Sequence, residues 1–297
     1  MRLPYAGMVA GLALVLPGAL SAQSTCVPEF VQTAQTVIVQ DVIVGRQDLT
    51  VETFQVRVRN GADEANTCGA TLRVARLSTS PTLRPTRLML QSQGQALEIL
   101  PRETAPGSVR SDLRIAQLPA GRNGFSLPFQ IGIPSGWGAQ SGQQTDDLLI
   151  LLVNDAGQIL DTLPLTIQVT IPPAAEVRVV GATGTDPVAR IDLGDLDPAQ
   201  LTVSERFGIR VWSTSAYNVR FESENAGALV HSEGRGRIPY ELLMDRQRVS
   251  VVGAIAAQVP QGTDALGDFH PLQLQVRSFT ARAGFYSDRV QVTVTAS

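Results

Sequence analysis

Residues that build catalytic and metal sites are scarce in this sequence. It contains two histidines, His231 and His270, which are separated in the chain and have no cysteine or second histidine at the spacing of metal ligands. It also has no Gly-x-Ser-x-Gly elbow around a nucleophilic serine. We therefore predict no catalytic residue, no metal site and no cofactor, and we expect that the protein is not an enzyme.

Two acidic pairs are the remaining candidates for chemistry. Asp146 and Asp147 are adjacent, and Asp192 lies close to Asp195. Such pairs can act as glycosidase carboxylates or as calcium ligands. Both pairs flank predicted strands, where aspartate commonly forms turns, and we interpret them as structural.

An excess of positive charge is also missing. The chain has 24 basic residues, all of them arginine, against 27 acidic residues, and its formal net charge is −3. A protein that binds nucleic acid or an anionic membrane surface usually carries a basic patch and a positive balance. We therefore expect neither nucleic acid nor a membrane surface as a partner.

Long apolar runs are absent from most of the chain. One short run, Met8–Leu16, follows a positive charge at Arg2 and precedes small residues that end at Ala22. This pattern predicts a secretory signal peptide over residues 1–22, with the cleavage site uncertain by about one residue. No later run approaches the roughly 18 residues that a membrane helix needs, so we expect no membrane span in the mature chain. The predicted location is the periplasm in transit, then the cell surface or the exterior.

The chain has only two cysteines, Cys26 and Cys68. Export would take both to a compartment where disulfides form and persist, so we predict that they pair. A loop of this length would be stabilised by roughly 4 kcal/mol on the chain-entropy account. The alternative is that both are buried free thiols.

Apolar residues recur with period two in many short segments, and turn residues separate these segments. No stretch has a long helical stripe with caps at both ends, and the crossover helices of a parallel sheet are missing. We therefore predict an all-β protein with two antiparallel immunoglobulin-like β-sandwich domains after the signal peptide. The predicted strands are residues 36–44, 51–59, 70–77, 112–118, 125–133, 147–153 and 159–171, then 176–180, 189–193, 207–212, 217–222, 237–243, 248–253, 272–279 and 289–296.

A proline pair divides the two sets of strands. Residues 172–175 read Pro-Pro-Ala-Ala, and consecutive prolines cannot donate hydrogen bonds to a strand ladder. We predict a Pro-rich linker here, between an N-terminal sandwich over residues 23–171 and a C-terminal sandwich over residues 176–297.

The last predicted strand has the clearest alternation in the chain. Its apolar face consists of Val290, Val292, Val294 and Ala296. Its polar face consists of Gln291, Thr293 and Thr295. Because one face is so apolar, we expect this strand to lie deep in its sheet, and we expect its removal to unfold the second domain.

Three stretches of the C-terminal half share features with a known family. They are residues 191–196, residues 216–221 leading to 238–242, and residues 283–288 running into 290–295. The last stretch contains a Gly-x-Tyr-x-Asp turn, formed by Gly284, Tyr286 and Asp288, before alternating Thr and Val. In these features residues 176–297 resemble the pilin-like domains of the spore coat protein U family, which includes subunits of archaic chaperone–usher pili.

The resemblance implies a sandwich that lacks its final strand. The family's apolar groove would then lie beside Val290–Ala296, and its partners would be a periplasmic pilus chaperone, an usher and a neighbouring pilus subunit that supplies a β-strand. The cysteines here fall in the first domain rather than in the pilin-like domain. That arrangement looks more like a two-domain tip adhesin, whose N-terminal domain binds an unknown receptor or surface. The alternative is a complete sandwich whose last strand ends at the C-terminus.

The two tryptophans suggest different roles. Trp137 lies in a glycine-containing loop and is our first candidate for contact with a surface or a sugar. The alternative is a ring folded back onto the sandwich. Trp212 follows the apolar alternation of Ile209 and Val211, and we interpret it as core or groove lining.

The leading hypothesis is a secreted pilus subunit that assembles by donor-strand complementation and acts in cell adhesion. One alternative is a freestanding periplasmic or extracellular binding module with two complete sandwiches. Another is the periplasmic assembly chaperone itself, which also has two sandwich domains. A strand donor that stabilises the second domain would distinguish the first hypothesis from the freestanding module.

Overall fold

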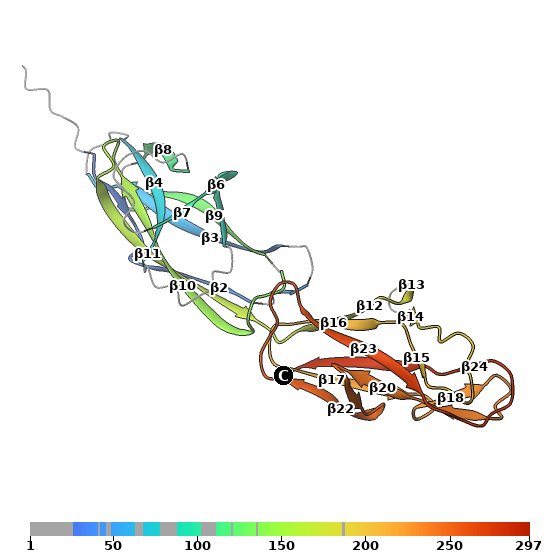
Figure 1. Cartoon of the computed structure of the whole chain (residues 1–297). Helices are drawn as coiled ribbons and strands as arrows, with labels where there is room; N and C mark the ends of the chain where they lie inside the picture. Colours follow the sequence, from blue (N-terminus) through green and yellow to red (C-terminus); the bar gives the residue numbers. More distant parts are fainter. Residues whose placement is uncertain are drawn as a thin grey trace, which may run out of the picture.

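The computed structural model describes residues 26–40, 42–45, 49–62, 68–77, 88–101, 111–119, 121–134, 136–185 and 188–297. The predicted signal peptide, residues 1–22, lies outside the described residues. Within these ranges the regular structure consists of β-strands, which form two sandwiches arranged end to end (Figure 1). The all-β, two-sandwich fold predicted from the sequence is confirmed. Across the described ranges we find no helix with the length and apolar character needed to span a bilayer.

The first sandwich is built from residues 28–171. One sheet has the order β1 (Pro28–Phe30), β3 (Leu49–Asn60), β9 (Phe125–Pro134), β5 (Met89–Ser92) and β6 (Gln95–Leu97). The facing sheet has the order β2 (Gln35–Val39), β11 (Ile159–Ile171), β10 (Gly142–Val153), β4 (Cys68–Arg76) and β7 (Ile99–Leu100), with β8 (Leu113–Leu118) also on β4. Period-two alternation buries one face of each strand, and Val56, Phe129, Ile150 and Leu165 are completely buried between the sheets.

Two strand pairs in the first sandwich are parallel, which the sequence pattern did not predict. Strand β2 pairs in parallel with β11, and β4 pairs in parallel with β7. Parallel neighbours need a long connection, which is usually a helix. Here the connecting chain passes through strands of the facing sheet, so no helix is needed.

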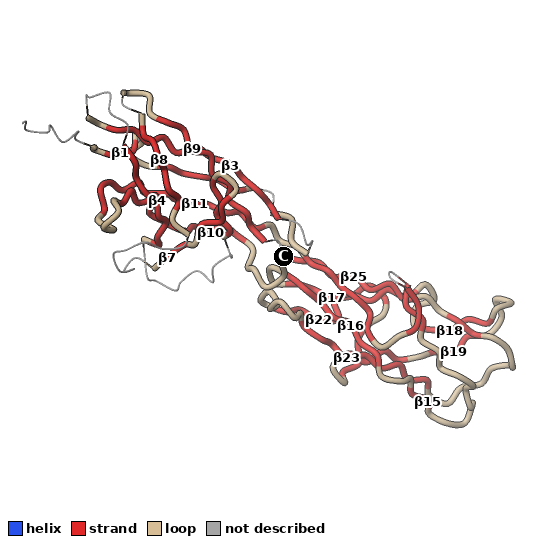
Figure 2. The backbone as a smooth tube through the Cα atoms, turned by 90° about the horizontal axis from the view of Figure 1, so that it is seen from above, coloured by secondary structure: helices blue, strands red, loops and turns tan. Residues whose placement is uncertain are grey.

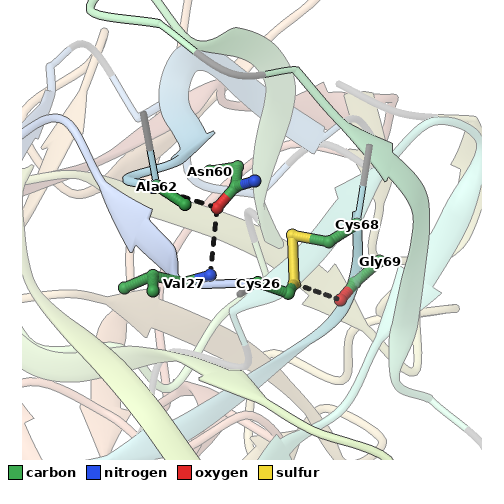
Figure 3. The surroundings of a disulfide bond; sticks show 6 residues. All are labelled: Cys26, Val27, Asn60, Ala62, Cys68 and Gly69. Carbon is green, nitrogen blue, oxygen red and sulfur yellow. Dashed lines mark hydrogen bonds between the residues drawn. A yellow bond between two sulfur atoms is a disulfide. The ribbon is translucent and has the colours of Figure 1, made fainter. Parts of the chain in front are cut away.

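The disulfide between Cys26 and Cys68 is confirmed. It ties the first described residue to the start of β4, with 5.6 Å between the two Cα atoms. Beside it the buried Asn60 side chain accepts hydrogen bonds through Oδ1 from the Val27 amide at 3.0 Å and the Ala62 amide at 3.1 Å (Figure 3). The bridge and Asn60 together hold the N-terminal segment against the sandwich.

The second sandwich is built from residues 175–297. Its larger sheet has the order β12 (Ala175–Val180), β16 (Phe207–Ser213), β23 (Asp268–Val276), β20 (Glu241–Met244) and β21 (Gln247–Val249), with β15 (Thr202–Val203) also on β23. Facing it is the sheet β22 (Val252–Val259), β17 (Tyr217–Ser223) and β25 (Val290–Ala296). A small sheet of β19 (Arg237–Pro239), β18 (Ala228–His231) and β24 (Tyr286–Ser287) lies at one end, and β13 (Thr183–Thr185) pairs with β14 (Val188–Arg190).

Thr214, a fully buried residue, joins the two sandwiches. Its carbonyl accepts a hydrogen bond from the Ser141 amide of the first sandwich at 2.7 Å. Its hydroxyl donates to the Pro172 carbonyl at 3.0 Å and accepts from the Ala174 amide at 2.9 Å. The C-terminus lies at this junction in both views, because the Ser297 amide bonds to the Ala216 carbonyl (Figures 1 and 2).

Candidate functional site: an open seam in the second sandwich

The expectation that β25 lies deep in its sheet is wrong. It pairs with β17 along one side, and no strand among the described residues pairs with its other side. Alternation along a strand reports which face is apolar, but it carries no information on whether both edges are paired. The strand therefore has one apolar face that is directed at the core and one edge without a partner strand among the described residues.

Strand β12 is the matching edge of the facing sheet. It pairs with β16 and with no other strand of the described chain. The two edge strands lie close together but are not joined by a ladder. We call the gap between these two edges, lined by Val177, Val179, Val292 and Val294, the open seam.

The side chains of the open seam point inward but are only half-buried. Val292 and Val294 pair in register with Phe221 and Val219, which are almost completely buried. On the other sheet Val177 and Val179 pair with Val211 and Ile209, which are equally well buried. The core of the second sandwich is therefore fully buried at β16 and β17, the strands next to the two edges. At the edge strands β12 and β25 it is partly exposed to water.

The edge strands of the first sandwich behave differently. On edge strand β2 the inward side chains of Val37 and Val39 are 6% and 0% exposed, and on edge strand β1 Phe30 is 8% exposed. Being at an edge does not by itself expose inward side chains in this protein. The partial exposure at the open seam is a local feature of the second sandwich.

The free edge of β25 also lacks the usual protection against pairing. Natural edge strands are commonly blocked by charged residues, proline or bulges. Strand β25 contains no charged residue and no proline, and it pairs with β17 in continuous register over its 7 residues. On β12 the charged side chains of Glu176 and Arg178 pair with each other at 2.7 Å on the outer face. An added strand would thus meet no charge along the β25 edge.

The Gly-x-Tyr-x-Asp turn is held by a buried histidine. A Cβ added to Gly284 would lie 2.0 Å from Nε2 of His231, so only glycine fits there. The His231 ring packs edge-on against Tyr286, with 5.0 Å between ring centroids. The Tyr286 hydroxyl donates to the Arg282 carbonyl at 2.9 Å, which closes the turn.

Asp288 fixes the start of β25. Its carboxylate accepts hydrogen bonds from the hydroxyls of Ser223 and Tyr240 and from the backbone amide and side chain of Asn225. Burial, followed by the hydrogen bond to Asp288, raises the pKa of the Tyr240 hydroxyl above its ordinary value. The carboxylate therefore positions β25 rather than facing solvent or a ligand.

His270, the second histidine, belongs to a polar cluster within the second sandwich. The hydroxyl of the buried Tyr217 lies 2.8 Å from Oδ2 of Asp268 and 3.0 Å from Nε2 of His270. Nδ1 of His270 lies 2.9 Å from Oδ2 of Asp245. Burial, together with the bond to Asp268, raises the pKa of the Tyr217 hydroxyl. No group of three metal-type ligands occurs within the described ranges.

The acidic pairs make local structural contacts. Asp146 pairs with Arg76 at 2.9 Å, and burial raises the pKa of its carboxyl despite that arginine. Asp147 accepts a hydrogen bond from the Thr166 hydroxyl at 2.8 Å. Asp192 accepts a hydrogen bond from the Gly194 amide at 2.9 Å, as a turn-forming aspartate does.

Both tryptophans pack against other residues, and neither lies in the core. The half-buried Trp137 ring packs against Gly45, where an added Cβ would be 2.7 Å from the ring, and the next residue, Gly138, packs against Ala265 of the second sandwich. That placement at the junction fits the folded-back alternative. The expectation for Trp212 is wrong, because period two turns it outward, where the Arg178 guanidinium covers its ring.

The sequence did not reveal that β12 forms the second edge of the open seam. The alternation of β12 was visible, but Val177 and Val179 carried no signal that their strand would end a sheet opposite β25. The Pro172–Pro173 break marks the approach to this strand, but it does not say which strands β12 will pair with.

Comparisons with known proteins give distant structural likenesses. No family model matches the chain, so the resemblance to the spore coat protein U family stays a prediction, and no curated protein matches it. The chain is similar to one from the CsuC–CsuE chaperone–tip adhesion subunit pre-assembly complex of archaic Csu pili of Acinetobacter baumannii, with 12% identity, TM-score 0.44 and coverage of 90% of this chain and 99% of that one.

Two further solved structures show similar coverage. CfaE, the adhesive subunit of CFA/I fimbria of enterotoxigenic Escherichia coli, shares 12% identity over 90% of this chain and 94% of that one, with TM-score 0.41. The CupB6 tip adhesin from Pseudomonas aeruginosa shares 10% identity over 91% and 94%, with TM-score 0.33. At this level of similarity the strand arrangement of the protein itself is the better guide to function.

Proposed function

We propose that the second sandwich accepts a β-strand from another polypeptide into the open seam, and that the protein is an exported subunit of a surface pilus. The observation that supports this most directly is the half-burial of Val177, Val179, Val292 and Val294 between two unpaired edges. In this proposal the first sandwich, whose core is closed, is the binding domain of a tip adhesin.

The directions of the two edges constrain the incoming strand. Strand β12 starts at the junction, where Ala175 pairs with Ser213, and β25 ends there, where Ala296 pairs with Tyr217. The edges therefore run in opposite directions, and any strand between them is parallel to one and antiparallel to the other. A strand antiparallel to β25 gives the better hydrogen-bond geometry along that longer, unprotected edge.

The partners follow from this requirement. An edge with an apolar seam is an aggregation hazard until it is covered, so a periplasmic chaperone would supply a strand first. A neighbouring pilus subunit would then replace that strand, with an usher as the assembly site. The disulfide agrees with passage through an oxidising compartment.

A synthetic strand tests the proposal. The probe is a soluble peptide with seven alternating Val and Thr residues, and the control peptide carries Asn in place of each Val. The mature chain should bind the first peptide and melt at a higher temperature, with new amide protection in β12 and β25. Equal melting temperatures with both peptides would mean that the seam does not accept a strand.

A further inference from the structure

Phe285 is exposed in an unusual way for a large apolar residue. Its exposed fraction is 87%, the highest among the exposed large hydrophobic residues of the described chain. It lies between Gly284 and Tyr286, in the turn that leads into β24. An isolated exposed apolar side chain is common, but a fully projecting aromatic ring on a fixed turn is a typical binding anchor.

The backbone around Phe285 is held in place while its ring is free. The Phe285 carbonyl accepts a hydrogen bond from the Ser232 amide at 2.8 Å. On one side Gly284 packs against the buried His231, and on the other Tyr286 pairs with His231 across β18 and β24. A ring on such a turn loses little conformational freedom on binding, which favours its use as an anchor.

An exposed ion pair lies beside this turn in the chain. Arg282 forms an ion pair with Glu233, and both side chains are largely exposed. Binding hot spots commonly consist of an apolar or aromatic centre inside a polar rim. The exposed Phe285 ring and this ion pair therefore combine an aromatic group with charged groups, as binding hot spots do.

The position of this surface relates it to the open seam. Phe285 directly precedes β24, which lies at the end of the second sandwich that points away from the first (Figure 1). Strand β25 follows β24 after only a few residues. The other end of the seam faces the junction, where Ser141 bonds to Thr214 and Gly138 packs against Ala265. The first sandwich occupies that end, which leaves the opposite end, near Phe285, for the folded body of a strand donor.

We propose that Phe285 anchors the folded body of the polypeptide that supplies the strand, by entering an apolar pocket beside that strand. This inference rests on the proposed function, because it assumes that the seam accepts a strand. The partner is a folded protein that carries an alternating apolar β-segment next to an apolar pocket. The seam then binds the segment, and Phe285 recognises the protein that carries it.

Photocrosslinking in the cells that produce the protein tests this inference. A photoreactive phenylalanine is placed at Phe285, at Gln291 on the outer face of β25, or at Leu266, which is 74% exposed at the junction end. Positions 285 and 291 should capture the same polypeptide, identified by mass spectrometry, and position 266 should not capture it. The captured polypeptide is then purified for binding measurements.

The binding measurements compare Phe285→Ser with the control Leu266→Ser. Loss of a hot-spot aromatic should weaken binding of the whole partner at least about tenfold, while binding of the seven-residue peptide stays unchanged. Leu266→Ser should change neither. Capture at 291 without capture at 285, or unchanged affinity of Phe285→Ser, would overturn the role of Phe285 and leave the strand-acceptor proposal standing. No capture at 291 would contradict both.

Discussion

A strand added to the chain itself should fill the open seam. Because β25 ends at the junction, a short turn after Ser297 followed by seven alternating Val and Thr residues would run back along β25 as a hairpin. The added strand would be antiparallel to β25 and parallel to β12. Its valines would then cover the half-buried valines of the seam.

The expected stabilisation can be worked out from the seam. Full burial of a valine contributes about 1.5–3 kcal/mol. Val177, Val179, Val292 and Val294 already have most of their surface buried, so covering the exposed remainder of all four contributes about 2 kcal/mol. The new backbone hydrogen bonds, at about 1 kcal/mol each, roughly offset the cost of ordering the added residues. For a sandwich of this size, about 2 kcal/mol corresponds to a rise in melting temperature of about 5–10 °C.

Differential scanning calorimetry measures this effect on the second sandwich. The matched control carries a Gly-Ser extension of the same length, and a second control carries Asn in place of each added Val. Only the Val-Thr extension should raise the melting temperature. If all three extended chains melt together, the exposed valines do not form a strand-accepting site.

Three variants test the supporting structure. Gly284→Ala should displace His231 and lower the free energy of unfolding of the second sandwich by about 2 kcal/mol or more, measured by urea unfolding. Asp288→Asn should cost about 2–3 kcal/mol in the same assay, because the replacement amide accepts fewer of the donated hydrogen bonds. Replacing Cys26 and Cys68 by Ser should cost about 2–5 kcal/mol in the first sandwich and leave the second unchanged. Unchanged unfolding curves would contradict each assignment.

Part of the fold could be predicted from local patterns in the sequence. The alternation of residues 290–296 predicted both the strand and its apolar face, since period two is a property of the strand alone. The cysteine pairing followed from export chemistry and from there being only two cysteines. In both cases the prediction depended on no knowledge of which strands become neighbours.

The features that sequence reasoning missed depend on the arrangement of strands in space. That β25 is an edge strand, and that β12 is the opposite edge, follows from pairing between residues far apart in the chain. The prediction for Trp212 was wrong because strict alternation from the inward Ile209 and Val211 turns the next residue outward. Phe285 gave no signal, because the sequence does not tell a projecting aromatic residue from a packed one.

Hydrogen exchange at single amides, followed by NMR, tests the central claim most directly. In the protein alone, the amides of β12 and β25 that point into the seam should exchange fast, while those that point toward β16 and β17 are protected. Addition of the Val-Thr peptide should protect the seam amides of both strands. Seam amides that are already protected in the protein alone, or that still exchange fast with saturating peptide, would contradict the account.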